Sequence, residues 1–292
     1  MALPEPPEAR RPMLPSDTYA GQVVAITGGG TGLGKAMAIE FARAGAAVAI
    51  LGRKDDARAR GVAAVADAGG RAVEAACDVR DAEQIARAFD RVEEALGPIA
   101  VLVNNAAGNF PVAAEDCSPN GWRAVVQIVL DGTFLCSREL ARRRKAAGCP
   151  GAILNIAATY AWTGGPGAAH SAAAKAGVVN LTQTLAVEWA AFGIRVNALA
   201  PGLFPHDDMA PHMRANRPGG YADVGRTIPA GRVGRLHELG WAATYLCSPY
   251  AAYVSGHTFV IDGANWLRRG LQMPEYRPVA EQIVARPPGR DG

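Results

Sequence analysis

The hydrophobic positions of this chain fall into short apolar runs that alternate with longer amphipathic stretches. Runs rich in Val, Ile, Leu and Ala are typical of buried strands, and they cover residues 23–27, 47–51, 72–77, 100–104, 152–156, 195–200 and 258–262. Helical periodicity covers residues 33–45, 55–69, 81–96, 119–147, 168–192 and 235–247. This alternation predicts an α/β fold, a single-domain doubly wound parallel sheet of about seven strands (a Rossmann fold) with helices on both faces.

Three segments depart from this rhythm. Residues 1–18 are Pro-rich and carry acidic side chains, unlike a transit peptide, so we expect a disordered or surface arm before a domain at 19–270. Residues 271–292 are expected to form a loose C-terminal tail. Residues 203–230 are rich in Pro, Gly and Met with weak periodicity, which favours a lid of short helices over a substrate, or else a surface excursion without a role.

The bulk composition is that of an ordinary globular protein, with 49% hydrophobic and 20% charged residues. A formal charge of +3 without any basic run gives no indication of nucleic-acid binding. Five scattered cysteines without close pairs indicate a reducing, cytoplasmic setting and no metal site. No apolar stretch is long enough to span a bilayer, so no membrane association is expected.

The first apolar run is followed directly by a Gly-rich loop and then a helix. Glycines at these positions let a backbone turn tightly and approach a pyrophosphate, which then lies on the helix N-terminus. The loop with its candidate cofactor residues is Gly28, Gly30, Thr31, Gly32, Leu33 and Gly34.

The second apolar run ends at Arg53 and Lys54. A dinucleotide without an extra phosphate favours an acidic residue there, to bind the ribose 2′-hydroxyl. Two cations fit a 2′-phosphate instead, which favours NADP(H) over NAD(H). The alternative is that both are ordinary solvated surface cations.

Three further strand ends carry candidate cofactor contacts. Asp78 and Val79 follow the third run, where the carboxylate suits an adenine amino group. Small residues around Asn105 and Ala106 leave room for the adenosine ribose, and an Asn amide there can bridge neighbouring strands. Pro201, Gly202 and Leu203 follow the sixth run, and their backbone groups are expected to contact the nicotinamide amide.

The stretch 156–175 places a phenol and an amine at the carboxyl edge of the predicted sheet, where open α/β folds bind ligands. Tyr160 lies in the loop after the fifth strand, and Lys175 lies on the following helix. Ser171 is four residues before Lys175, so the two share one helix face.

These motifs together resemble the short-chain dehydrogenase/reductase superfamily over roughly residues 20–266. In most members a Ser, a Tyr, a Lys and an Asn perform the chemistry. Here the Tyr position is Ser171, the Ser position is Ala158 and the Asn position is Asp131, and Lys175 alone is retained. Serine is a poor acid for protonating an alkoxide, which weakens the ordinary ketone-reductase interpretation.

The pattern is similar to that of the 2,4-dienoyl-CoA reductases, particularly the mitochondrial type. Segments in matching order are residues 27–35, 77–81, 104–110, 118–122 and 128–133. The resemblance implies that Tyr160 and Lys175 are the working pair, with Ser171 in support. Residues 170–197 also resemble peroxisomal trans-2-enoyl-CoA reductases, which likewise lack the usual Tyr, and the two alternatives stay open.

The resemblance implies NADPH-dependent reduction of a conjugated acyl-CoA thioester, a reaction of fatty acid metabolism. Hydride reaches the far end of the conjugated system, and charge builds on the thioester oxygen, which Tyr160 would stabilise as a donor. Asp131 stands where the family has a donating Asn, so we expect it to be either a neutral donor or turned toward Lys175. Asn109 and Phe110 extend toward the substrate side, with core packing as the alternative for Phe110. The resemblance implies that Arg80 meets coenzyme A phosphates, and the alternative is a solvated surface arginine.

Two other hypotheses remain from the residues themselves. The first is a 3-oxoacyl or ketone reductase that uses Tyr160 as a displaced acid. The second is a catalytically silent NADP-binding scaffold, because three family positions are lost. The resemblance also implies a homotetramer formed through the long helices near residues 121–147 and 168–192.

Overall fold

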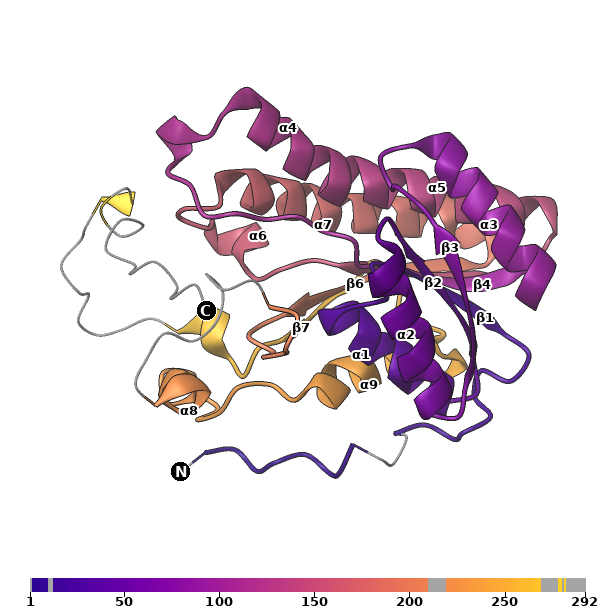
Figure 1. Ribbon diagram of the computed structural model, residues 1–292, viewed down its shortest axis with the longest axis horizontal. Helices are drawn as coiled ribbons and strands as arrows, with labels where there is room; N and C mark the ends of the chain where they lie inside the picture. Colours follow the sequence, from indigo (N-terminus) through magenta and orange to yellow (C-terminus); the bar gives the residue numbers. More distant parts are fainter. Residues whose placement is uncertain (1, 10–12, 210–218, 269–277, 280, 282–292) are drawn as a thin grey trace.

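The computed structural model describes residues 2–9, 13–209, 219–268, 278–279 and 281. Its centre is a sheet of seven parallel strands in the order β3-β2-β1-β4-β5-β6-β7 (Figure 1). The strands are β1 (Val23–Thr27), β2 (Ala47–Gly52), β3 (Arg71–Ala76), β4 (Ile99–Asn104), β5 (Gly151–Ile156), β6 (Ile194–Pro201) and β7 (Thr258–Ile261). The predicted fold class is confirmed, and each predicted strand lies within two residues of its observed bounds.

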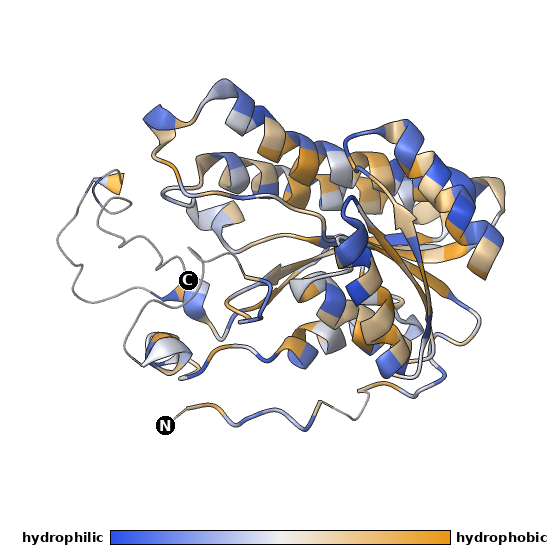
Figure 2. Cartoon of the chain, viewed as in Figure 1, coloured by the Kyte–Doolittle hydropathy of each residue, from blue (hydrophilic) through white to orange (hydrophobic). Residues whose placement is uncertain are grey.

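Helices cover both faces of the sheet because each βαβ unit returns the chain over one face. One face carries α1 (Gly32–Arg43), α2 (Asp55–Asp67) and α9 (Leu236–Cys247) (Figure 1). The other carries α3 (Ala82–Leu96), α4 (Pro119–Val126), α5 (Gly132–Ala146) and α7 (Ala169–Trp189). Figure 2 shows the apolar residues along the strands and on the inward sides of the helices, as a sheet buried between two layers requires.

Two apolar cores follow from the alternation of side chains along the strands. Val24 and Ile26 point to the α1 side and pack with Met37 and Phe41, whereas Val23 and its neighbours pack toward α3 and α5. Because both faces are buried, the strands consist of nearly continuous apolar residues, and this is why their positions could be predicted from the sequence.

The predicted helix over residues 119–147 is interrupted, and this corrects the sequence-based expectation. A π-helical turn, η2 (Gln127–Asp131), separates α4 from α5. A β-carbon at Gly132 would lie 2.6 Å from Val79, so the chain passes close to the end of β3 at this point. Such turns are frequent at functional sites, and this one ends on Asp131.

The N-terminal arm lies on the surface over the described residues 2–9. The amide of Leu3 donates to the carbonyl of Ala230 over 2.8 Å, and Glu5 forms an ion pair with Arg235. Tyr19 is fully buried against Phe41, at the boundary where the core begins. The predicted tail 271–292 lies almost entirely outside the described residues.

The predicted lid is described at residues 203–209 and 219–230, and residues 210–218 lie outside the described ranges. The described part contains one short helix, α8 (Gly220–Gly225). Among the described residues, every helix is too short or too polar to cross a membrane.

Ala264 adopts a left-handed conformation with φ of 66°, unlike any other non-glycine residue that the structure describes. A β-carbon clashes with the backbone in this region, which costs about 1–2 kcal/mol. The substitution Ala264→Gly therefore should stabilise the protein by about 1 kcal/mol, after the added freedom of the unfolded chain is subtracted. Urea unfolding measures this change.

The matched control is Ala252→Gly, at an exposed alanine with an ordinary φ of −57°. That variant should be neutral or less stable. Equal effects of the two substitutions would show that Ala264 is not strained.

Candidate active site

The candidate catalytic residues meet where β5 ends and the chain turns into α7. The one-turn helix α6 (Tyr160–Thr163) carries the phenol, and α7 carries Ser171 and Lys175 one turn apart. Because the strands are parallel, this edge also holds the ends of β1, β4 and β6. The sequence thus places its phenol and its amine at the ligand-binding edge of the sheet.

Tyr160 and Ser171 are joined by a hydrogen bond of 3.0 Å between their hydroxyl oxygens. Ser171 is buried, so its hydroxyl is fixed by the surrounding protein. Tyr160 is half-buried, so part of its phenol ring stays accessible to solvent. A serine side chain extended by one hydrogen bond reaches about as far as a tyrosine at the same position would. The phenol of Tyr160 is therefore held beside the position at which most family members carry their tyrosine.

Lys175 is 6% exposed, and its Nζ donates a hydrogen bond to the carbonyl oxygen of Ile156 at the end of β5. Burial lowers the pKa of Lys175 to about 8 from its ordinary value of 10.5. The side chain is still mostly protonated at neutral pH, and one cation therefore lies at this edge of the sheet.

The other wall of this site comes from the loop after β4. Phe110 packs edge-on against the buried ring of His170, with 4.4 Å between ring centroids. The amide of Val112 donates to the carbonyl of Gly167 over 2.9 Å, so this loop is fastened to the loop that precedes α7. Phe110 therefore lies beside Ser171, on the side where the sequence predicted substrate contacts, and the neighbouring Asn109 is exposed.

Asp131 is exposed at the end of η2, which packs against α7 through Val129 and Ala174. No ion pair joins Asp131 to Lys175 in the part of the chain that the structure describes, because the lysine bonds to Ile156 instead. The expectation that Asp131 turns toward Lys175 is therefore not met. A neutral, donating Asp131 stays a prediction.

The Gly-rich loop between β1 and α1 is held open by its neighbours. The hydroxyl of Thr27 accepts hydrogen bonds from the backbone amides of Asn105 and Ala106, each with a length of 3.0 Å. The side-chain amide of Asn105 donates hydrogen bonds to the backbone carbonyls of Thr27 and Gly28. A β-carbon at Gly30 would lie 2.0 Å from the carbonyl oxygen of Ala57, so only glycine fits there.

These bonds assign different roles to the predicted cofactor residues. Asn105 and Ala106 shape the loop through Thr27, a residue that the sequence analysis missed. Thr31 precedes α1 but makes no side-chain cap, and Leu33 and Gly34 lie within the first turn of the helix.

A buried polar network joins β4 and β5. The amide nitrogen of Asn104 donates to Asn155 and to Ser137, each over 2.8 Å, and Asn155 donates to Thr182. The expected bridging of strands by an Asn amide is thus observed, at Asn104 as well as at Asn105.

Arg53 and Lys54 are both exposed at the end of β2. Neither forms an ion pair with any residue that the structure describes. The turn that carries them is braced by Arg58, which is 7% exposed and donates to the carbonyls of Gly52 and Arg53. Arg58 was missed because a buried arginine inside a helix leaves no pattern that distinguishes it from a surface one.

Asp78 and Arg80, which were expected to contact two different ligands, form an ion pair with each other. The guanidinium Nε of Arg80 lies 2.9 Å from a carboxylate oxygen of Asp78, and this bond lowers the pKa of Asp78. Both follow β3, which is four strand positions from β5, or about 19 Å across the sheet. The structure therefore places Arg80 beside the adenosine-side residues, far from Tyr160, while the side chain of Val79 is buried.

In the turn after β6, some backbone groups already form hydrogen bonds within the protein. The amide of Gly202 donates to the carbonyl of Ile261, and the carbonyl of Leu203 accepts from Gly234. Any contact with a nicotinamide from Pro201, Gly202 and Leu203 would have to use their remaining backbone groups, such as the amide of Leu203.

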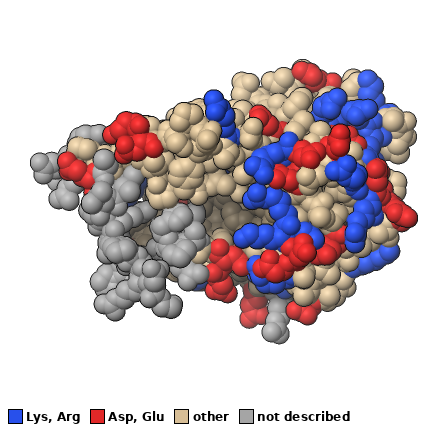
Figure 3. Space-filling model, turned by 45° about the horizontal axis from the view of Figure 1, so that its top comes forward, with Lys and Arg blue, Asp and Glu red and all other residues tan. Residues whose placement is uncertain are grey.

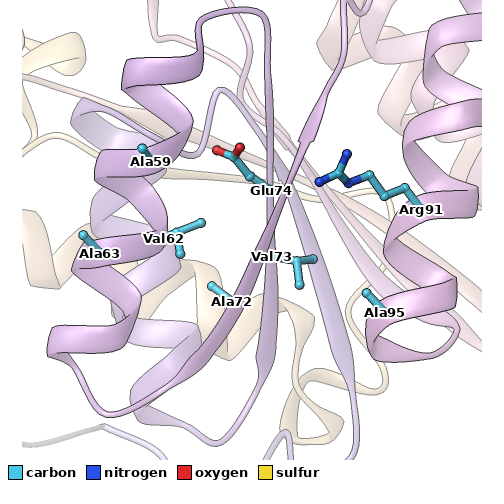
Figure 4. Close-up of a pocket in the computed structure, with 8 residues that line it drawn as sticks. All are labelled: Ala59, Val62, Ala63, Ala72, Val73, Glu74, Arg91 and Ala95. Carbon is cyan, nitrogen blue, oxygen red and sulfur yellow. The ribbon is translucent and has the colours of Figure 1, made fainter.

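A separate apolar groove of about 520 Å³ lies outside the edge strand β3 (Figure 4). Ala59 and Val62 of α2 and Ala95 of α3 line it, with Glu74 and Arg91 as its charged groups. It contains none of the candidate catalytic residues. Figure 3 shows a different hollow, beside which Lys and Arg side chains are gathered on one side.

A parallel sheet with a Gly-rich turn after β1 and a buried lysine at its carboxyl edge defines a dinucleotide-dependent oxidoreductase. A model of the enoyl-(acyl carrier protein) reductase family, which is a short-chain dehydrogenase/reductase family, matches residues 28–264. The chain belongs to this family, and the predicted resemblance is confirmed. Members of the family bind a nicotinamide cofactor.

Relatives of this chain include a Bacillus subtilis protein named "Probable 2,4-dienoyl-CoA reductase [(2E)-enoyl-CoA-producing]". It is 42% identical over 250 residues, which cover 84% of this chain and 97% of the relative. The crystal structure of a short chain dehydrogenase from Bacillus anthracis is 42% identical, with a TM-score of 0.78 over 86% of this chain and 98% of that one. A gluconate 5-dehydrogenase from Burkholderia cenocepacia, solved with NADP and tartrate, is 32% identical, with a TM-score of 0.78 over 87% and 99%.

The residues present fit a dinucleotide. The Gly30 position leaves no space for a β-carbon, the Gly32 amide at the start of α1 donates to a carboxylate oxygen of Asp208, and two exposed cations stand at the end of β2. Lys175 lies at the far end of the same edge, where the nicotinamide ribose would be held.

The depressed pKa of Lys175 predicts how stability depends on pH. Between pH 8 and 10.5 the unfolded chain binds a proton that the folded protein has lost, so the free energy of unfolding contributed by this group rises with pH. The slope is at most about 1.4 kcal/mol per pH unit. Urea unfolding of the wild type and of Lys175→Met across this range measures the difference.

In Lys175→Met this contribution is removed. The free energy of unfolding of the variant, relative to that of the wild type, should therefore be highest below pH 8 and decrease above it. A constant difference between the two proteins from pH 7 to pH 10 would show that the lysine titrates normally.

Proposed function

We propose that this protein is an NADPH-dependent reductase of conjugated enoyl or dienoyl thioesters of coenzyme A. The observation that carries the proposal is the phenol of Tyr160, held by Ser171 one helical turn from the buried Lys175. The dienoyl-CoA reductase names among the relatives support the same substrate class.

The reaction requires a donor aimed at the substrate oxygen. A reduced nicotinamide supplies a hydride to the far end of the conjugated system. The electron pair displaced through the double bonds then accumulates on the thioester oxygen as an enolate. Tyr160 donates its hydroxyl proton in a hydrogen bond to that oxygen, which is the role of an oxyanion-hole donor.

Ser171 sets the direction of the phenol proton. The bond between the two hydroxyls can be donated from either side. When Ser171 donates to Tyr160, the phenol proton is free to point to the substrate, so the pair acts as one extended donor. The carbon-bound proton of the product comes from water, and no acid at position 171 itself is required.

Lys175 contributes charge and position. Its protonated amine favours electron density on neighbouring oxygens and would hold the nicotinamide ribose from the end of β5. Asn109 and Phe110 form the substrate side of this cleft. The guanidinium of Arg80 is bonded to Asp78 after β3, and its contact with coenzyme A phosphates stays a prediction.

A second candidate is reduction of a ketone, with Tyr160 as the displaced acid. The gluconate 5-dehydrogenase neighbour has the same fold, so the scaffold is compatible with alcohol and ketone chemistry. The enolate route is preferred because it needs a hydrogen-bond donor and no proton transfer from the protein. The homotetramer implied by the family stays a prediction.

Parallel assays separate these reactions. NADPH absorbance should fall with 2,4-dienoyl-CoA or 2-enoyl-CoA, and more slowly with acetoacetyl-CoA. In Tyr160→Phe, kcat should fall by about 100-fold, the effect of losing one oxyanion donor, with the Kd for NADPH unchanged. Ser171→Ala should give a smaller loss, because the phenol remains but is no longer directed.

Tyr253→Phe, at a fully exposed tyrosine, is the matched control and should retain activity. In the same assay, Asp131→Asn with an unchanged rate and pH profile would make Asp131 purely structural. Faster turnover of acetoacetyl-CoA would favour the ketone reductase. NADPH binding without turnover of any of the three would support a silent scaffold.

The preference for NADPH rests on Arg53 and Lys54, whose exposed side chains form no ion pair with the described residues. A 2′-phosphate would gain charge-assisted hydrogen bonds from them, each stronger than a neutral one. Their turn is fixed by Arg58, which limits the entropy lost on binding.

The substitution Arg53→Ala should raise the Kd for NADPH about tenfold or more and leave the Kd for NADH unchanged, because only NADPH carries the 2′-phosphate. Titration of cofactor fluorescence gives both constants.

Arg60→Ala serves as control, since Arg60 is exposed nearby on α2 and is already paired with Asp56. Equal losses for the two cofactors, or none for either, would contradict the assignment of Arg53.

A further inference from the structure

The N-terminus of α1 is bonded to a carboxylate from a distant part of the chain. The amide of Gly32 donates to Oδ2 of Asp208 over 2.8 Å, and the amine of Lys35 lies 3.1 Å from the same oxygen. Asp208 belongs to the segment after β6, 176 positions away in the sequence. Thr31, the residue that precedes the helix, provides no side-chain cap of its own.

This helix end is where the family's pyrophosphate would lie. The first amides of a helix have no partner within it, and the helix dipole adds positive potential, so both favour an anion. In this structure the anion is the chain's own carboxylate. Burial alone would raise the pKa of Asp208, but the bonds from Gly32 and Lys35 outweigh burial and lower it, so Asp208 is ionised at neutral pH.

A second side chain of the same segment covers the loop. A β-carbon at Gly32 would lie 2.7 Å from Cε1 of the His206 ring, which means that the ring rests on the backbone of the glycine. His206 and Asp208 together therefore occupy the space directly over the start of α1.

The described part of this segment is anchored at both ends. Met209 is 5% exposed, and the hydroxyl of Tyr221 donates a hydrogen bond to its Sδ at a distance of 3.4 Å. Phe204 is 5% exposed, and a β-carbon at Gly234 would lie 2.3 Å from its ring. The carbonyl of Leu203 accepts from the amide of Gly234. Residues 203 and 204 are therefore fixed in the core, and any displacement of Asp208 begins after Phe204.

We propose that Asp208 is a built-in competitor of the cofactor: its carboxylate takes the Gly32 amide and the Lys35 amine, so the pyrophosphate of the cofactor enters by displacing this carboxylate. A carboxylate and a pyrophosphate cannot share these donors, because two anions at hydrogen-bond distance from one amide repel each other. This inference rests on the proposed function only in requiring a dinucleotide with a pyrophosphate.

The displacement links cofactor binding to the substrate side of the cleft. Residues 205–209 continue directly from the turn after β6, which lies at the same edge as Tyr160 and Lys175. The cofactor thus has to break the Asp208 contacts at the sheet edge that also carries the candidate catalytic residues.

The test is cofactor affinity rather than turnover. Asp208→Ala should lower the Kd for NADPH, for NADH and for ADP-ribose about tenfold each, equal to about 1.4 kcal/mol. ADP-ribose carries the pyrophosphate and lacks the nicotinamide, so it isolates the contested site. Asp208→Asn keeps the side-chain shape and removes the charge, so it should give a smaller decrease. Calorimetric titration measures all three ligands.

Asp207→Ala is the matched control, because it removes the same charge one residue away while the bonds of Gly32 and Lys35 go to Asp208. Its affinities should stay within about twofold of the wild type. An unchanged or raised Kd for ADP-ribose in Asp208→Ala would overturn the proposal. If that variant does not fold, an unchanged Kd for ADP-ribose in Asp208→Asn would overturn it equally.

Failure of this inference is distinguishable from failure of the proposed function. If the protein prefers NADH, the tightening with ADP-ribose and NADH is still expected. If no thioester is reduced, the binding constants still decide the role of Asp208, because no turnover enters the measurement.

Discussion

The candidate active site depends on one hydrogen bond, the 3.0 Å contact between the hydroxyls of Tyr160 and Ser171. Ser171 alone is too short to reach a substrate, and Tyr160 alone would be one residue of a short surface helix. The bond joins them into a single group whose position is fixed by α7.

Lys175 imposes the second constraint, because a buried amine is costly unless it finds an acceptor. Its acceptor is the carbonyl of Ile156, the last residue of β5. The bond fixes the amine against the sheet edge, and the remaining desolvation explains why the pKa falls to about 8. The site thereby combines a fixed cation with a phenol held by Ser171, as the proposed stabilisation of an oxyanion requires.

Local pattern was sufficient to predict the sheet and most helices, because strands buried on both faces are apolar almost throughout. It was insufficient for the π turn at residues 127–131, which accompanies the close approach of Gly132 to Val79, a contact between distant segments. The ion pair of Arg80 was missed for a simpler reason. Its acceptor lies two residues away at Asp78, and a family position does not record such a local ion pair.

The phenol and the amine could be placed from the sequence because both follow strand ends in a parallel sheet. Their connection could not, since Tyr160 and Ser171 have no periodicity in common and meet only when α6 folds back on α7. The contact between Asp208 and Gly32 was equally invisible, as it arises from a segment with weak periodicity. Residues near strand ends were thus predictable as candidates, and their partners were not.

A common physical rule accounts for which donors are already paired. The Gly32 amide sits at a largely buried helix end, where an unpaired donor is costly, and it is bonded to Asp208. Arg53 and Lys54 are exposed, where water satisfies them, and they form no ion pair within the described residues. A site built for an anion must therefore either admit water or provide its own anion in the absence of the ligand. In this chain water satisfies the cations at the adenosine end, and Asp208 provides the anion at the pyrophosphate position. The affinity for a dinucleotide therefore depends on the strength of the Gly32–Asp208 bond as well as on the new contacts.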